Sequence, residues 1–240
     1  MRFFASLRMT GKPALSSRYE TTGDECLSEV KQFFRFRFSK EADLRFISHH
    51  DLMRLCERAL RRAHLPVAMS EGFNPRPRIS LPASLGVGIS GCNEVLDFEL
   101  DEWVRPDEVM RRLAAQLPDG IELKSVQNLP SKPDRCPTQH SYRIPLLEGH
   151  PVTEERVREL LAAERLLLRR RSKGRIKTLD IRPFIERIRC EDGAILLLLR
   201  ATEQGTARPE EVLEALGCRP GVHYLRGAMQ RTHVSLSSPP

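Results

Sequence analysis

The chain has 240 residues, 40% of them hydrophobic, and its 39 Lys and Arg exceed its 32 Asp and Glu by seven charges. This length fits one large or two small domains, and the longest apolar run, GAILLLL, is too short to cross a membrane. The six cysteines form no CxxC pair, which argues against a disulfide scaffold, a zinc ribbon or an iron–sulfur cluster and favours a reduced, cytoplasmic setting. The basic balance favours a polyanionic partner such as nucleic acid.

The first 30 residues differ from the rest of the chain. They show no lasting hydrophobic period, and no acidic residue precedes Glu20. Organelle transit peptides have such a composition, but a disordered tail or an upstream start codon is the simpler interpretation. We therefore expect residues 1–30 to lie outside the fold.

A first module is predicted over residues 31–130. Phe and Arg alternate in KQFFRFRFSK, which predicts a half-buried strand. Apolar residues recur at three and four in SHHDLMRLCERALRRAHL, which predicts a helix capped by Ser48, with Asp51 reaching back. The pattern then predicts an interrupted strand region (LPVAMS, RISLPASLGV), a strand (NEVLDFELDEW), a helix (RPDEVMRRLAAQLP) and a strand (GIELKSVQNL).

The same six elements recur after a Pro-rich, polar linker at residues 131–140. Over residues 141–236 they are a strand (HSYRIPLLEG), a helix (TEERVRELLAAERLL), a strand region (IKTLDIRPFIERIRC), a strand (AILLLLRATE), a helix (RPEEVLEALG) and a strand (VHYLRGAMQRTHVSL). Both second helices open on Arg-Pro-acid-Glu-Val, at the position where proline suits a helix. The order predicts an α+β fold of two tandem ferredoxin-like (β-α-β-β-α-β) modules.

A dense basic segment runs from Arg165 to Arg189, with ten Lys or Arg and only two acidic residues, Asp180 and Glu186. Such cations can neutralise phosphates, although most charge runs are solvated faces. Asp180 and Arg182 point the same way along an extended chain and are expected to pair. The candidate nucleic-acid contacts here are Arg169, Arg170, Arg171, Lys173, Arg175, Lys177 and Arg182.

The stretch SEGFNPRPRIS is a second candidate site. Asn74 before Pro75 favours a turn, and Arg76 and Arg78 share a face of an extended chain. Pro77 excludes an ordinary central strand, so the segment is either an edge turn with solvated arginines or a rigid loop that presents cations to a polar ligand.

The motif SHHD at the predicted helix start contains two histidines and an aspartate. Consecutive side chains on a helix diverge, so we expect no metal site and at most one histidine facing a ligand.

The stretch from Phe34 to Gly88 resembles the opening of the radical-SAM-linked family of uncharacterised bacterial proteins. The resemblance rests on RFSK, LRFISHHDLMR and ERALRRAHLPVAMSEGFNPRP, and a looser match continues through KGRIKTLDIRPFIE and ARPEEVLEAL. The motif residues are Ser48, His49, Asp51, Arg54, Glu57, Arg58, Arg61, Gly72, Phe73, Asn74, Pro75 and Pro77. The resemblance implies a radical SAM partner that carries a 4Fe-4S cluster and S-adenosylmethionine. This chain has no CxxxCxxC motif, so we expect it to bind no cofactor itself.

Three functions are compatible with these features. The first is an accessory module without activity of its own that binds tRNA or rRNA and presents it to the radical SAM enzyme, with Arg54, Arg61, Asn74, Arg76 and Arg78 joining the basic segment. The second is an RNA-processing or RNA-modifying enzyme in which His49, Asp51 and Arg76 act as acid, base and electrostatic groups. The third is a protein–protein adaptor for the radical enzyme.

Overall fold

The computed structural model describes residues 31–172, 174–202 and 205–237, so the predicted extension at residues 1–30 lies outside the described residues. The strands are β1 (Gln32–Lys40), β2 (Ile79–Ser80), β3 (Ser90–Leu100), β4 (Ile121–Leu129), β5 (Pro137–Pro145), β6 (Leu167–Ser172), β7 (Arg175–Asp180), β8 (Ile185–Glu191), β9 (Ala194–Thr202), β10 (Gly205–Thr206) and β11 (Gln230–Leu236). The α-helices are α1 (His49–Arg62), α2 (Pro106–Ala114), α3 (Glu154–Ala162) and α4 (Pro209–Ala215).

One mixed nine-stranded sheet organises this α+β protein. Its main path runs β10-β9-β5-β11-β3-β1-β4, while β2 pairs with β3 and β8 pairs with β9. The first half, residues 31–130, contributes neighbours in the order β4-β1-β3-β2, and the second half, residues 137–237, in the order β11-β5-β9-β8. The halves meet where β11 runs parallel to β3, with Gln230 opposite Ser90 and Arg231 opposite Gly91. The two halves therefore share a single sheet.

Each half has its own apolar core on one face of the sheet. In β1 the buried Phe34, Phe36 and Phe38 alternate with half-buried arginines, as the strand pattern predicts, and they cluster with Leu52 and Leu60 of α1. In the second half, alternate residues of β9 cluster with apolar residues of α3 and α4. The alternation of the strands thus directs large apolar side chains to one side and leaves arginines on the other.

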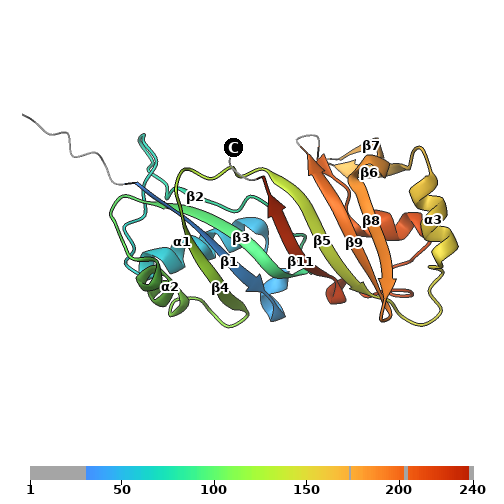
Figure 1. Cartoon of the computed structure of the whole chain (residues 1–240), viewed down its shortest axis with the longest axis horizontal. Helices are drawn as coiled ribbons and strands as arrows, with labels where there is room; N and C mark the ends of the chain where they lie inside the picture. The colour runs from blue at the N-terminus through green and yellow to red at the C-terminus, as the bar shows by residue number, and fades with distance from the viewer. Residues whose placement is uncertain (1–30, 173, 203–204, 238–240) are drawn as a thin grey trace, which may run out of the picture.

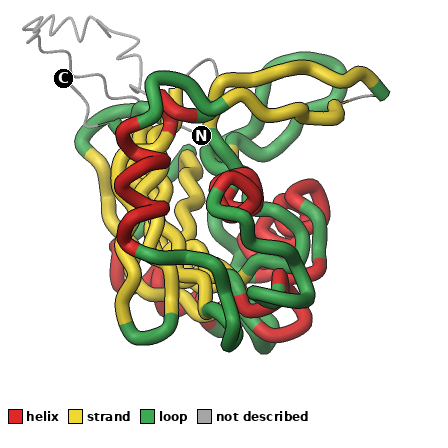
Figure 2. The backbone as a smooth tube through the Cα atoms, turned by 90° about the vertical axis from the view of Figure 1, so that its right-hand side faces the viewer, coloured by secondary structure: helices red, strands yellow, loops and turns green. Residues whose placement is uncertain are grey.

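The helices leave one face of the sheet uncovered. Figure 1 looks onto this face, with α1 and α4 behind the strands, α2 beside β4 at one end and α3 beyond β8 at the other. Figure 2, turned by 90°, shows the strands on one side and most of the helices on the other. The β6–β7 hairpin extends beyond the body as a two-stranded arm in the same view. The open face is accordingly a surface on which a large ligand can lie flat.

Several predicted boundaries in the second half were wrong. The helix expected over residues 153–167 ends at Ala162, and Leu167 already begins β6. The strand region expected over residues 176–190 is divided into β7, a 3₁₀ turn at Arg182–Phe184 and β8, because Pro183 lacks the N–H that a continuous ladder needs. Strand β5 begins at Pro137, inside the range expected to be linker.

Candidate nucleic-acid interface

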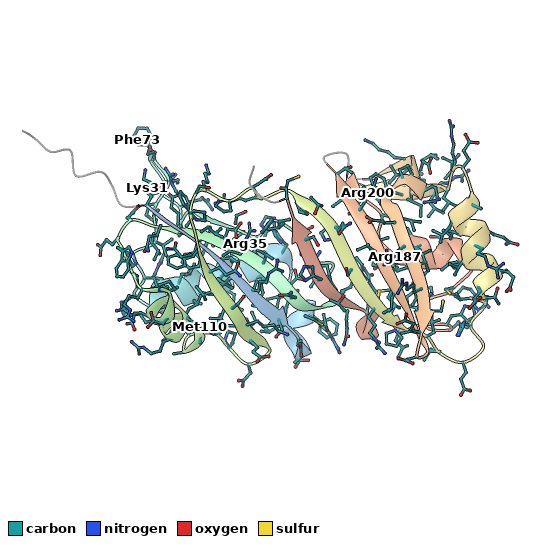
Figure 3. The ribbon with its side chains drawn as sticks, in the orientation of Figure 1. Lys31, Arg35, Phe73, Met110, Arg187 and Arg200 are labelled. Carbon is teal, nitrogen blue, oxygen red and sulfur yellow. The ribbon has the colours of Figure 1, made fainter. Side chains whose placement is uncertain are left out.

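Four arginines project from the open face of the second half. They are Arg143 on β5, Arg187 and Arg189 on β8, and Arg200 on β9. Leu196 and Leu198 of β9 lie between them, and we call the surface formed by these six residues the arginine face. In β9 the buried Ile195, Leu197 and Leu199 belong to the core, so the intervening residues must face outward. Figure 3 shows Arg187 and Arg200 on these strands.

Strand register arranges the arginine face as a grid. Leu196 lies opposite Arg189 on one side and Arg143 on the other, while Leu198 lies between Arg187 and Ser141. Because neighbouring strands are about 4.8 Å apart, the outer residues of each row are about 10 Å apart at the backbone. The rows surround a depression of about 270 Å³ that also reaches Thr232. The surface therefore offers a flat aliphatic floor with cations on two sides.

These guanidinium groups are only weakly engaged within the protein. The closest carboxylate to Arg189 is that of Glu191 at 3.9 Å, and Arg200 is likewise 3.9 Å from Glu186. Both contacts are largely solvent-exposed, and such pairs contribute little to stability. Among the described residues, no carboxylate lies within ion-pair distance of Arg143 or Arg187. An anionic ligand can therefore bind the guanidinium groups of the arginine face without breaking strong ion pairs within the protein.

The open face of the first half is built differently. Arg35 donates from Nε and Nη2 to the two carboxylate oxygens of Asp97 at 2.7 and 2.9 Å, and the Asp97 side chain is fully buried. Arg37 donates to the carbonyl oxygen of Val234 at 3.3 Å, and burial lowers its pKa. Both guanidinium groups are thus engaged by other strands of the sheet, whereas the weakly engaged arginines of the open face lie in the second half.

The predicted basic segment is divided by the fold. Arg170 is bound by Glu211, and Arg182 donates to the carbonyl oxygens of Leu161 and Ile185, so neither guanidinium is free. The expected Asp180–Arg182 ion pair is not formed: the Asp180 carboxylate accepts from the backbone N–H groups of Leu166 and Arg182. These hydrogen bonds lower the pKa of Asp180.

The remaining candidates of this segment lie on the β6–β7 arm. Arg169 and Lys177 are exposed there. Lys173 and the side chains of Arg171 and Arg175 lie outside the described residues. Because Arg170 of the arm is bound to α4, the arm belongs to the helix side of the sheet, away from the arginine face.

Helix α1, which carries the first group of family-motif residues, begins at the position that the sequence predicts. The Ser48 hydroxyl oxygen accepts from the backbone N–H of Asp51 and the hydroxyl donates to its carboxylate at 2.7 Å, which lowers the pKa of Asp51. Burial lowers the pKa of His49, with smaller effects from neighbouring His50 and the buried cations Arg231 and Lys40. Asp51 is therefore held in a capping role, and His49 favours its neutral form.

The second signature segment folds as a hairpin over residues 68–78, which we call the signature hairpin. Asn74 and Arg76 are exposed near its tip, while Arg78 is 3.5 Å from Glu71 and 3.6 Å from Glu99. The hairpin lies against α1, where Met69 and Pro77 line a small groove together with Arg61 and Leu60. The fold thus brings Arg61 close to the hairpin, but among the described residues no hydrogen bond or ion pair joins His49 or Asp51 to Arg76.

The sequence patterns did not lead us to predict the arginine face. Arg187 and Arg189 fall inside the basic segment but were not selected, and Arg143 and Arg200 stand outside it. The alternation of Arg with apolar residues in IERIRC was the available signal, but only the strand register shows that these arginines surround two leucines.

No three His, Cys, Asp or Glu side chains in the described part of the chain come together as a metal site. None of the helices in the described ranges is long and apolar enough to cross a membrane.

The fold and the site define an α+β protein with a one-sided sheet and a cationic open face. Residues 34–209 match the family model described as "Uncharacterized protein conserved in bacteria (DUF2344)", and the chain belongs to this family. No curated protein matches the chain. Among solved structures, the chain is similar to an unknown protein from Galdieria sulphuraria, at 14% identity and a TM-score of 0.25, over 78% of this chain and 91% of that one.

Proposed function

We propose that this protein is an accessory module without catalytic activity of its own, which binds structured RNA such as tRNA or rRNA and presents it to a radical SAM enzyme. The radical SAM partner, with its 4Fe-4S cluster and S-adenosylmethionine, follows from the resemblance of residues 34–88 alone. The proposal of RNA binding is supported by the residues themselves, and the arginine face is the observation that carries it.

The two halves are, in this proposal, tandem ferredoxin-like units. Each half runs strand, helix, strand, strand, helix, strand, apart from the arm inserted after α3 and the short β10. In each half the first strand lies between the third and fourth, and the second strand lies at the outer side of the third. This arrangement supports a duplicated unit, and sheets of this kind serve as RNA-binding surfaces by analogy.

The chemistry of the arginine face favours recognition of the RNA backbone. Guanidinium groups bind phosphate oxygens through paired N–H donors. In the row Arg189–Leu196–Arg143 the two arginines are about 10 Å apart at the backbone. Leu196 and Leu198 form an apolar floor and cannot hydrogen-bond to base edges. We therefore expect affinity for folded RNA that depends steeply on salt and weakly on sequence.

The test is fluorescence anisotropy of the full chain with labelled tRNA and a labelled rRNA fragment across a salt series. The double variant Arg187→Gln/Arg189→Gln should weaken binding tenfold or more and reduce the slope of log K against log salt by about 1.5. The matched control is Arg105→Gln/Arg111→Gln, which removes the same charge from exposed positions around α2. It should leave the slope close to that of the wild type.

The outcomes separate the candidate functions. Equal losses in both double variants would mean that binding follows net charge and would remove the arginine face as the site. Absence of wild-type binding at low salt would overturn the RNA proposal and favour the adaptor function. Catalysis by His49, Asp51 and Arg76 has weaker support, because Asp51 is engaged by the Ser48 cap.

A further inference from the structure

The tip of the signature hairpin carries a fully exposed aromatic ring. Phe73 has a relative exposure of 106%, so its side chain touches almost nothing in the protein. Figure 3 shows Phe73 at the end of a loop that projects from the body. Single exposed apolar residues are common on surfaces, and what distinguishes Phe73 is its place at the end of a hairpin that projects from the body. Its position calls for a partner that receives the ring.

The base of the hairpin is closed by hydrogen bonds. The backbone N–H of Ser70 donates to the Arg76 carbonyl oxygen at 2.8 Å, and that of Arg78 donates to the Ala68 carbonyl oxygen at 2.7 Å. The Ser70 hydroxyl oxygen also accepts from the backbone N–H of Arg76 at 2.9 Å. Gly72 has a φ of 118°, a conformation that L side chains rarely adopt, so the turn before Phe73 depends on glycine. The ring is therefore presented on a preorganised support.

Cations lie on and beside this support. Arg76 is exposed on the hairpin itself. On the adjacent helix α1, Arg54, Arg58 and Arg61 are exposed at spacings of four and three, which places them along one helix face. The C-terminal end of α1 lies against the base of the hairpin, where Leu60, Arg61, Met69 and Pro77 line one groove. Arg61 is therefore next to the aromatic support, and Arg58 and Arg54 follow it along the helix away from the hairpin.

The single exposed ring of Phe73, close to arginine side chains, suits a nucleic-acid partner better than a protein partner. Apart from Phe73, the tip consists of Glu71, Gly72, Asn74 and Pro75, and so it offers one large apolar side chain. Protein interfaces usually bury a contiguous apolar centre with a polar rim. Proteins that bind unpaired nucleotides combine aromatic rings that stack on bases with cations that contact the phosphates.

We propose that Phe73 stacks on an unpaired base of the bound RNA while Arg76 and the α1 arginines contact the flanking phosphates. This inference rests on the proposed function. Phe73 and the arginine face lie toward opposite ends of the long axis of the molecule (Figure 3), and α1 lies on the helix side of the sheet. A single RNA therefore reaches all of these groups only if it is extended and also folds around the edge of the sheet, as a structured RNA such as tRNA can. An aromatic contact at one end and phosphate contacts at the other would fix the direction of the RNA on the sheet.

The first test measures affinity. Phe73→Ala in the full chain should weaken tRNA binding by about 5- to 100-fold, the range expected for loss of one stacked base, and leave the slope of log K against log salt unchanged. A fully paired RNA duplex should bind both proteins equally. Phe46→Ala is the matched control, because Phe46 is also an exposed phenylalanine, outside the hairpin, and its loss should leave tRNA affinity unchanged.

The second test reports on stacking directly. Trp103 is the single tryptophan of the chain, so F73W in a W103F background places one fluorophore at the tip. Addition of tRNA should quench its emission and protect it from acrylamide, and the paired duplex should do neither. Wild-type affinity in Phe73→Ala, together with unchanged emission in F73W, would overturn the inference and leave Phe73 as an anchor for a protein. Failure of the wild type to bind RNA would overturn the proposed function itself.

Discussion

Arg231 of β11 and Glu94 of β3 form a buried, bidentate ion pair across the junction of the two halves. The Arg231 Nε group donates to Glu94 Oε1 at 2.9 Å and its Nη2 group donates to Oε2, and the two side chains are only 1% and 4% exposed. Arg231 also donates to the carbonyl oxygens of Ala83 and Ser84 at 3.0 and 2.9 Å. Burial opposes the charge of Arg231, but the Glu94 carboxylate outweighs it and raises the pKa of the guanidinium. The pair therefore joins β11, β3 and the 83–84 loop.

Removal of one member of this pair should be strongly destabilising. Glu94→Leu leaves Arg231 charged and buried without a counter-ion, so we expect it to lower the free energy of unfolding by about 3–5 kcal/mol. The double variant Glu94→Leu/Arg231→Met replaces both charges with apolar groups and should recover most of that loss. Urea unfolding followed by circular dichroism measures both values.

An exposed ion pair supplies the control. Asp107→Asn removes the partner of Arg105 at the start of α2, where both side chains are largely exposed, and should change stability by less than about 1 kcal/mol. A Glu94→Leu protein as stable as the Asp107→Asn protein would show that water or a local shift compensates Arg231, and that the pair does not hold the halves together.

His140 should make the protein sensitive to mild acid. It is buried on β5, its Nδ1 atom has no hydrogen-bond partner among the described residues, and burial together with the nearby charge of Arg231 lowers its pKa to about 4. The unfolded chain binds a proton at the ordinary histidine pKa of about 6.5, whereas the folded chain stays neutral, so stability falls as the pH drops from about 6.5 to 4.

The substitution His140→Leu tests this pH dependence. Between pH 7.5 and pH 5.0 the wild type should lose about 2 kcal/mol more stability than this variant, because the variant lacks His140, whose protonation opposes folding, and keeps every other histidine. Urea unfolding at the two pH values gives the difference, and an NMR titration of the His140 ring gives its pKa directly. A measured pKa near 6.5 would contradict the prediction.

Local patterns predicted the first half well and the second half less well. The Ser48 cap, helix α1 and the alternation of Phe34, Phe36 and Phe38 depend on neighbouring residues, and these appear where the sequence indicates. Between Ala162 and Leu167 the chain has no proline or glycine, so apolar periodicity alone could not end the helix and begin β6.

The candidate site depended more on long-range contacts than on local pattern. The pairing of β11 with β3 joins residues about 140 positions apart, and nothing near Arg231 in the sequence marks Glu94 as its partner. One residue near Glu94 in the sequence is related to the ion pair: Gly91 leaves room for the Glu94 side chain, because a Cβ atom at position 91 would lie 2.5 Å from the Cγ atom of Glu94. The arginine face likewise required the register of three strands, which the basic composition of the segment could not supply.

Arg170 and Arg169 are adjacent in the sequence but should behave in opposite ways when replaced. Arg170 donates from Nε and Nη2 to the two Glu211 carboxylate oxygens at 2.6 Å each, and Nη2 also donates to the Thr206 carbonyl oxygen at 3.0 Å. Arg169 points to the other side of β6 and is exposed.

Arg170→Gln should therefore lower the free energy of unfolding by about 1–3 kcal/mol, because hydrogen bonds to a charged partner that is mostly buried are lost. Arg169→Gln should change it by less than about 0.5 kcal/mol. Urea unfolding of the two single variants tests this, and anisotropy with tRNA should give the same salt slope for Arg170→Gln as for the wild type. An Arg170→Gln protein of wild-type stability with a reduced salt slope would mean that Arg170 exchanges Glu211 for RNA phosphate, and the arm would then join the RNA-binding surface.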